Sequence, residues 1–282
     1  MYIILRLIDN LNLLDGLLES GFTDHWLPVA ARTLPSSWGP DIKAKFLRIQ
    51  PVVLTKSIDL EKGDEGKHRH FGQDEPLPFV VKTILGRGGS GQVDRVLSLI
   101  SYKEYARKRI RRTHIFGDAK LNMRIYTNEL ETLKRLRHRH IVQLVGSYTD
   151  PVYLGLIMSP IADCDLAQFL SSVPSSPDKL PLLRSFFGCL ASAITFLHLA
   201  EIRHMDLKPE NFLCKEDAIL VTDFGLARDL TDLTQKTTVG TVLGMSPPYC
   251  SPEVAESEPR DYSADIWVSR MRLPGDAHSL EG

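Results

Sequence analysis

The chain has 282 residues, 43% of them hydrophobic, and a formal net charge of −1 at pH 7. This is enough apolar material for one large or two small globular domains. The near-neutral charge gives no reason to expect a nucleic acid, an anionic membrane surface or an acidic tail as a partner. Four widely spaced cysteines form no C-x-x-C pair, so we expect reduced thiols rather than a zinc site.

The first eight residues are apolar but are interrupted by Arg6, so they are too short to span a bilayer and lack a signal-peptide layout. We therefore expect an intracellular, cytoplasmic protein with no membrane partner. Leucines recur at roughly helical spacing from Leu11 to about Ala31, and residues 51–54 are compatible with a strand. We interpret residues 1–58 as a helical or irregular N-terminal region. Residues 59–78, charged and interrupted by glycine and proline, are interpreted as a linker.

A compact domain is predicted to begin at Phe79. Strand-like runs occupy residues 79–85, 92–100 and 104–110, followed by a helix over 121–137 and more strand over 141–158. After Asp163 the pattern becomes helical, most clearly over 182–199, where apolar residues lie on one face. The sequence therefore predicts an α+β fold, with a small antiparallel β lobe that has one helix and a second lobe that is mainly α.

The stretch from Lys103 to Arg139 is basic, with twelve Lys and Arg against four Asp and Glu, a net of +8. A nucleic-acid surface is expected to interleave aromatic residues, and this stretch has few. We expect a solvated basic face and no nucleic-acid partner.

Glycines are concentrated between Gly86 and Val93, where the chain reads G-x-G-x-x-G-x-V. Dinucleotide-binding folds use a similar pattern, but there the glycines open a helix, whereas the residues after Val93 are strand-like. A glycine hairpin between strands can fold over phosphates, because missing Cβ atoms let backbone N–H groups approach. An ordinary glycine-rich turn stays open as an alternative on this motif alone.

A lysine and a glutamate form the next candidate pair. Lys108 lies in the following predicted strand, and Glu129 interrupts the apolar stripe of the predicted helix. A carboxylate on that stripe is costly unless it is paired, so Lys108 is its expected partner and would then face ATP phosphates. In the alternative, Glu129 lies at the edge of the stripe and Glu131 points inward.

The most specific motif runs from His204 to Asn211 and is followed, twelve residues later, by Asp223-Phe224-Gly225. Phosphoryl transfer needs a carboxylate that accepts the proton of the attacking hydroxyl, which suits Asp206. Asn211 and Asp223 offer the hard oxygen ligands that magnesium prefers. Lys208 can neutralise charge on the transferred group.

These motifs, in this order, resemble the eukaryotic protein kinase family. The resemblance implies a two-lobed fold with ATP and Mg²⁺ in the cleft, a protein substrate, a lobe and hinge over 79–162, and Ser159 to Ala162 as the hinge. Asp-Leu-Lys-Pro-Glu-Asn, like Ser246 in the substrate-facing loop, is similar to serine/threonine rather than tyrosine kinases. The resemblance implies nucleotide contacts from Gly86, Gly88, Gly89, Gly91, Val93, Ala106, Lys108, Met158 (the gatekeeper), Ile161 and Asp165.

More narrowly, three phrases resemble a group of filamentous-fungal kinases. Two are Gly146 to Pro151 and Tyr249 to Ala255. The third is Phe22 to Pro28, which is similar to a Phe-Thr-Asp-x-x-Leu-Pro phrase that precedes the kinase domain in that group.

The sequence departs from the family in two places. Met205 replaces the usual arginine, which puts regulation by activation-loop phosphorylation in doubt. After Trp267 the expected helices do not follow, so residues 163–267 read as a partial second lobe and 268–282 as a divergent tail. The family's Asp265 should cap the catalytic loop, while Glu253 lacks its usual arginine. An ATP-binding scaffold and an inactive truncated fragment therefore stay open beside an active kinase.

Overall fold

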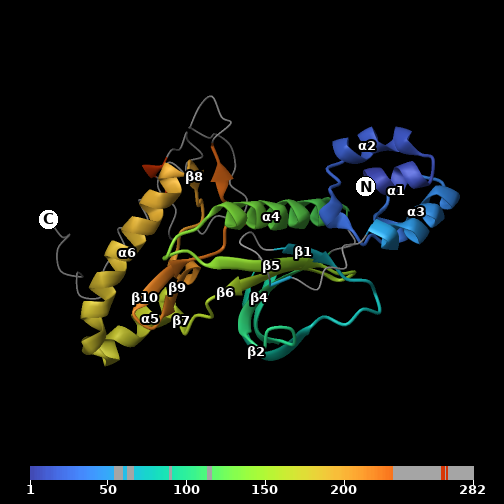
Figure 1. Cartoon of the computed structure of the whole chain (residues 1–282). Coiled ribbons are helices and arrows are strands. Elements are labelled where there is room, and N and C mark those ends of the chain that lie inside the picture. The colour runs from blue at the N-terminus through green and yellow to red at the C-terminus, as the bar shows by residue number, and fades with distance from the viewer. Residues whose placement is uncertain are drawn as a thin grey trace. The chain divides into compact units, whose positions relative to one another are not determined.

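The computed structural model describes residues 1–53, 60–61, 67–88, 91–112, 116–230, 262–263 and 265, with the backbone alone at 116–118 and 177. The chain divides into two compact units. The first comprises Met1–Leu130 with Leu144–Ser159, and the second comprises Glu131–Gln143 with Pro160–Gly282 (Figure 1).

A six-stranded sheet forms the centre of the first unit. Its strand order is β1-β5-β6-β4-β3-β2, and the pairs β2–β3, β3–β4 and β4–β6 are antiparallel. β1 pairs in parallel with β5, so the predicted antiparallel lobe has one parallel edge. The strands are β1 (Lys67–His70), β2 (Phe79–Gly88), β3 (Gly91–Ser98), β4 (Glu104–Arg111), β5 (Gln143–Thr149) and β6 (Tyr153–Ser159).

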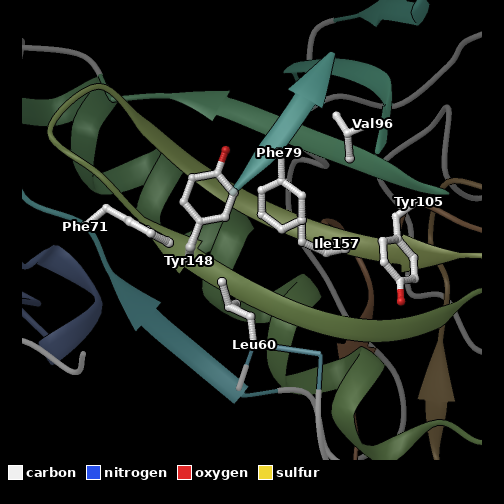
Figure 2. Close-up of a cluster of buried hydrophobic side chains, with 7 residues drawn as sticks. All are labelled: Leu60, Phe71, Phe79, Val96, Tyr105, Tyr148 and Ile157. Atoms are coloured by element: carbon white, nitrogen blue, oxygen red, sulfur yellow. The ribbon is translucent and has the colours of Figure 1, made fainter. Parts of the chain in front are cut away.

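The stretch predicted as a linker contains β1 and contributes to the core. Leu60 and Phe71 belong to a buried cluster with residues of β3, β4 and β6, and Figure 2 shows the rings of Phe79 and Tyr148 beside each other within it. A linker over 59–78 is therefore wrong for its described part. The error arose because isolated apolar residues in a charged stretch give no periodic signal. The cluster comprises Leu60, Phe71, Phe79, Val96, Tyr105, Tyr148 and Ile157.

The N-terminal region is helical, with boundaries that differ from the prediction. Only α2 and three short 3₁₀ turns lie where leucine spacing predicted helix, because Gly21 with φ +79° and Pro28 interrupt it. The strand at 51–54 is wrong as far as residue 53, since these residues form the last turn of α3. The helices are α1 (Tyr2–Leu7), α2 (Leu14–Glu19) and α3 (Pro40–Val53); the 3₁₀ turns are η1 (Leu11–Leu13), η2 (Asp24–Trp26) and η3 (Ala31–Thr33).

Helix α4 (Phe116–Arg135) begins earlier and ends earlier than its predicted range of 121–137. Its first fifteen residues belong to the first unit and the last five to the second. Tyr126, Leu130 and Leu133 are buried along one side, as the apolar period requires.

The second unit has short strands around a long helix. β7 (Cys164–Asp165), β9 (Phe212–Lys215) and β10 (Ala218–Val221) form an antiparallel sheet, and β8 (Ile202–Arg203) pairs with β11 (Arg228–Asp229). The helices are α5 (Leu166–Ser172) and α6 (Leu180–Leu199), with 3₁₀ turns η4 (Val173–Ser175), η5 (Pro177–Lys179) and η6 (Pro209–Asn211). The mixed α+β class is as predicted. Cys164, Cys189 and Cys214 are free thiols, and Cys250 lies outside the described residues.

Helix α6 buries the stripe that the sequence predicts, including Leu183, Phe186 and Leu197. At 20 residues it is also, among the described helices, long and apolar enough to cross a membrane. A core helix of a soluble protein passes the same test, so this property is weak support for a membrane span.

Candidate active site

The glycine motif lies in the hairpin between β2 and β3, where Gly86 is opposite Val93 and Gly88 is opposite Gly91. Gly91 has φ +128°, and a Cβ there would lie 2.4 Å from the carbonyl oxygen of Arg109, so the position requires glycine. Gly86 and Gly88 have open space where a Cβ would stand. Because strand β3 follows the glycines, the dinucleotide-binding alternative is excluded; Gly89 lies outside the described residues.

Lys108 of β4 and Glu129 of α4 form a buried ion pair. Lys108 Nζ lies 2.9 Å from Glu129 Oε1 and 2.7 Å from Oε2. The side chain of Glu129 is 0% exposed, whereas that of Glu131 is 55% exposed, so the alternative with Glu131 inward is wrong. The buried carboxylate of Glu129, which would be costly to leave unpaired, is therefore the one that meets the Lys108 ammonium group.

Three further predicted contacts share a sheet face with Lys108. Val93 is opposite Lys108 across β3–β4, and Ala106 is opposite Met158 across β4–β6. Residues two apart on a strand and residues directly opposite lie on one face, so Val93, Ala106, Lys108 and Met158 do so. Ala106 and Met158 are buried and Val93 is half-buried, so the three form a small apolar surface beside the Lys108 ammonium group.

Asp206, Lys208 and Asn211 come together in the second unit. Lys208 Nζ donates to Asp206 Oδ2 at 2.7 Å, and Asn211 Nδ2 donates to the same oxygen at 3.0 Å. Asn211 Nδ2 also donates to the Asp206 carbonyl at 2.7 Å, which closes the loop on itself. Asn211 uses its amide nitrogen in these bonds, so Oδ1 is its atom suited to a cation.

Asp223 lies at the same end of the β9–β10 hairpin as Asn211. Phe212 is opposite Val221, and the Thr222 N–H donates to the Asn211 carbonyl at 3.0 Å. Asp223 has φ +63°, a conformation that costs free energy and that concentrates at functional sites. The hairpin thus places both predicted metal ligands next to one sheet end.

The remaining predicted contacts, Asp165 and Ile161, are separately placed. Asp165 caps α5 by accepting the Gln168 N–H at 2.8 Å, and it lies opposite Leu213 in the sheet. Ile161 is half-buried.

A buried carboxylate holds the backbone just before Asp206. Asp265 accepts the His204 N–H at 2.9 Å and the Met205 N–H at 3.0 Å, as the family resemblance implies. Burial opposes the charged form of Asp265, but bonds from His198, His204 and Met205 outweigh it and lower the pKa. Met205 has φ +69°, so these bonds hold a strained residue in place.

Sequence reasoning missed one buried carboxylate, Asp94 of β3. It lies 2.9 Å from Arg107 Nη2 and 2.9 Å from Arg109 Nε, and it is fully buried. A solvated basic face is therefore wrong for Arg107 and Lys108, which are both buried. The available signal was strand pairing, since Asp94 is directly opposite Arg107.

Several predicted positions lie outside the described residues: Ser246, Glu253, Trp267 and the phrase Tyr249 to Ala255.

Comparison with known proteins matches residues 79–269 to the protein kinase domain. The chain belongs to the protein kinase family. The match begins at the residue where the sequence predicts the compact domain. Strands β2 to β6, the Lys108–Glu129 pair and the Asp206 loop of this kinase all lie within it, whereas β1 lies before it.

Individual relatives of this kinase agree. It is 35% identical over 198 residues to serine/threonine-protein kinase ULK3 of Homo sapiens, covering 67% of this chain and 39% of that protein. It is 30% identical over 248 residues to 3-phosphoinositide-dependent protein kinase 1 of Rattus norvegicus, covering 85% and 43%. A probable myosin light chain kinase of Dictyostelium discoideum is 31% identical over 191 residues, covering 65% and 46%. The matches span less than half the length of each relative.

Proposed function

We propose that this kinase transfers the γ-phosphate of ATP, with Mg²⁺, to serine or threonine hydroxyls of a protein. The observation that carries the proposal is the cluster at Asp206, where Lys208 Nζ lies 2.7 Å and Asn211 Nδ2 lies 3.0 Å from Asp206 Oδ2. Lysine two residues after the aspartate favours serine and threonine acceptors, as do relatives whose names include serine/threonine-protein kinase.

The residues present fit a magnesium nucleotide. Asn211 offers an amide oxygen and Asp223 a carboxylate, which are hard oxygen donors. Among the described residues, no group of three or more His, Cys, Asp or Glu could hold a metal ion. When bound, Mg²⁺ supplies charge stabilisation to the phosphates.

Asp206 is the proposed general base. Its carboxylate accepts the proton of the substrate hydroxyl as the new oxygen–phosphorus bond forms, and the bond from phosphorus to the β–γ bridging oxygen breaks to release ADP. Lys208, whose Nζ lies 2.7 Å from Asp206 Oδ2, places a positive charge beside that carboxylate and beside the transferred group.

Lys108 is proposed to hold the α- and β-phosphates, and Glu129 to orient it. Gly86 and Gly88, with open space at their Cα atoms, let backbone N–H groups approach phosphate oxygens. Val93, Ala106 and Met158 offer an apolar surface for the base.

The proposal is tested by incubating the 282-residue chain with γ-labelled ATP, Mg²⁺ and a generic protein substrate, followed by phosphoamino-acid analysis. We expect label on serine and threonine. Label on tyrosine alone would contradict the acceptor class. Tight Mg²⁺–ATP binding without transfer would favour the ATP-binding scaffold instead.

A further inference from the structure

A short segment before the kinase domain is bound to it through backbone carbonyls. Arg112, which follows β4, donates from Nη1 to the Pro28 carbonyl at 2.8 Å and from Nη2 to the Trp26 carbonyl. Thr149 Oγ1 donates to the Leu27 carbonyl at 2.6 Å, and Gln50 Nε2 donates to the Val29 carbonyl at 3.0 Å. Four consecutive carbonyls, from residue 26 to residue 29, are thus held by side chains.

Apolar burial fixes the same segment. The rings of Phe22 and Trp26 stack with centroids 4.5 Å apart, and both side chains are almost fully buried, as is Leu27. These residues belong to the phrase from Phe22 to Pro28, which the kinase-domain match over residues 79–269 does not include. The phrase is therefore an added part of the first unit, built like a core element.

The segment also lies against the first half of α4. A Cβ on Gly21 would come within 3.1 Å of Lys120 Cε, and the rings of His25 and Tyr126 are 6.1 Å apart. Trp26 and Pro28 share a pocket of about 230 Å³ with Asn122 of α4. In Figure 1 one end of α4 lies beside the blue N-terminal helices.

The contact reaches the ion pair by a short path. Tyr126 is fully buried, and its hydroxyl donates to the Tyr148 carbonyl at 3.4 Å. Glu129 follows Tyr126 by three residues, about 4.5 Å along the helix axis, so the two side chains are neighbours on the same side of α4. Arg112 directly follows β4 and lies four positions after Lys108, so both partners of the ion pair are connected to the segment.

We propose that residues 22–29, from here on called the brace, hold α4 where Glu129 meets Lys108, with Arg112 as the positioning residue. The inference rests on the proposed function, because the Lys108–Glu129 pair is assigned to ATP phosphates. Without the brace, the first half of α4 loses its packing and Glu129 leaves the Lys108 ammonium more often.

Arg112 is suited to this role by its surroundings. Its Nη1 also donates to the Asp150 carbonyl at 2.7 Å, so one guanidinium joins the brace to the β5–β6 turn. Burial lowers the pKa of Arg112 to about 10, against the opposing charge of Asp150. A charged donor among carbonyls makes strong, directional bonds that a neutral side chain does not replace.

The test is a double-mutant cycle of Arg112→Gln and Glu129→Gln in the full 282-residue chain, read by calorimetric titration with Mg²⁺–ATP below the melting temperature of every variant. Arg112→Gln should raise the Kd about tenfold when Glu129 is present and less than about twofold when it is Gln. Arg111→Gln, an exposed neighbour, is the control and should leave the Kd unchanged. If Arg112→Gln does not fold, Thr149→Val removes a single brace bond and takes its place.

Hydrogen exchange of α4 in the absence of nucleotide provides an independent readout. Arg112→Gln should speed exchange around Glu129, while Arg111→Gln should not. Equal Kd changes in both backgrounds, together with unchanged exchange in α4, would show that the brace only adds stability and would overturn the inference. Failure of the unmodified chain to bind Mg²⁺–ATP would overturn the proposed function instead, and the exchange result would still decide the brace.

Discussion

Glu129 is buried on the side of α4 that carries Tyr126 and Leu133. A carboxylate there has lost its water, and Lys108 at 2.7 Å compensates part of that loss. The sequence showed the interruption of the stripe and hence the pairing. It left open whether Glu129 or Glu131 points inward. The answer depends on how the helix is rotated about its axis, and packing against the sheet decides that rotation.

Glu129→Gln should destabilise the fold by about 3–5 kcal/mol, because it leaves the Lys108 ammonium buried beside a neutral amide. The free energy of unfolding in urea measures the change. Glu131→Gln, which removes an exposed partner of Lys134, should cost less than about 0.5 kcal/mol. Equal losses for the two variants would contradict the burial argument.

His70 makes stability depend on pH. Burial lowers its pKa below the ordinary 6.5, helped by His25 and Arg112 and opposed by its bond to the Asp24 carbonyl and by the Asp24 carboxylate; the His68 ring also faces it. The folded state favours neutral His70. Its contribution to the free energy of unfolding is therefore fully present above pH 6.5 and is lost as the pH falls toward the lower folded pKa. Urea unfolding at pH 7.5 and 5.5 should show a drop that is smaller in His70→Gln. An equal drop in both proteins would assign the effect to other groups.

At the scale of elements, the long periodic helices were the most predictable. Helix α6 was predicted over 182–199 and spans Leu180–Leu199, because an apolar stripe of that length has one stable placement. Strand β1 was not predictable. Its sequence, Lys-His-Arg-His, has no apolar alternation, and it forms a strand only because β5 offers an edge to it.

The loop that carries Asp206 depends on Asp265 for its backbone conformation. Asp265→Asn keeps the shape but replaces a charged acceptor of two N–H groups by a neutral one, so it should cost about 1–3 kcal/mol near pH 7. Because the folded pKa of Asp265 is lowered, this stability exists above its ordinary value of 3.8 and is lost as the pH falls through the lower folded value. Thermal melts from pH 7 to pH 3 should thus converge for the two proteins. Asp217→Asn, an exposed carboxylate of the same unit, should melt like the unmodified chain throughout.

For the whole molecule, the order of the motifs is sufficient to predict the family, and the match over residues 79–269 confirms it. Asp206, Asn211 and Asp223 perform their proposed chemistry with few alternatives in residue type, so they mark their positions in the sequence. Asp94 and the brace were not predictable as contacts, because an arginine such as Arg112 reads as solvated until its acceptors are known. The residues with a proposed chemical role were therefore easier to locate from the sequence than the residues that position them.

The central claim, that Asp206 is the base of a phosphoryl transfer, is tested most directly by single-turnover transfer from γ-labelled ATP in the unmodified chain and in Asp206→Asn. Transfer should slow by about 10²- to 10⁴-fold in the variant, while Mg²⁺–ATP should bind with a similar Kd. Equal transfer rates in the two proteins would contradict it.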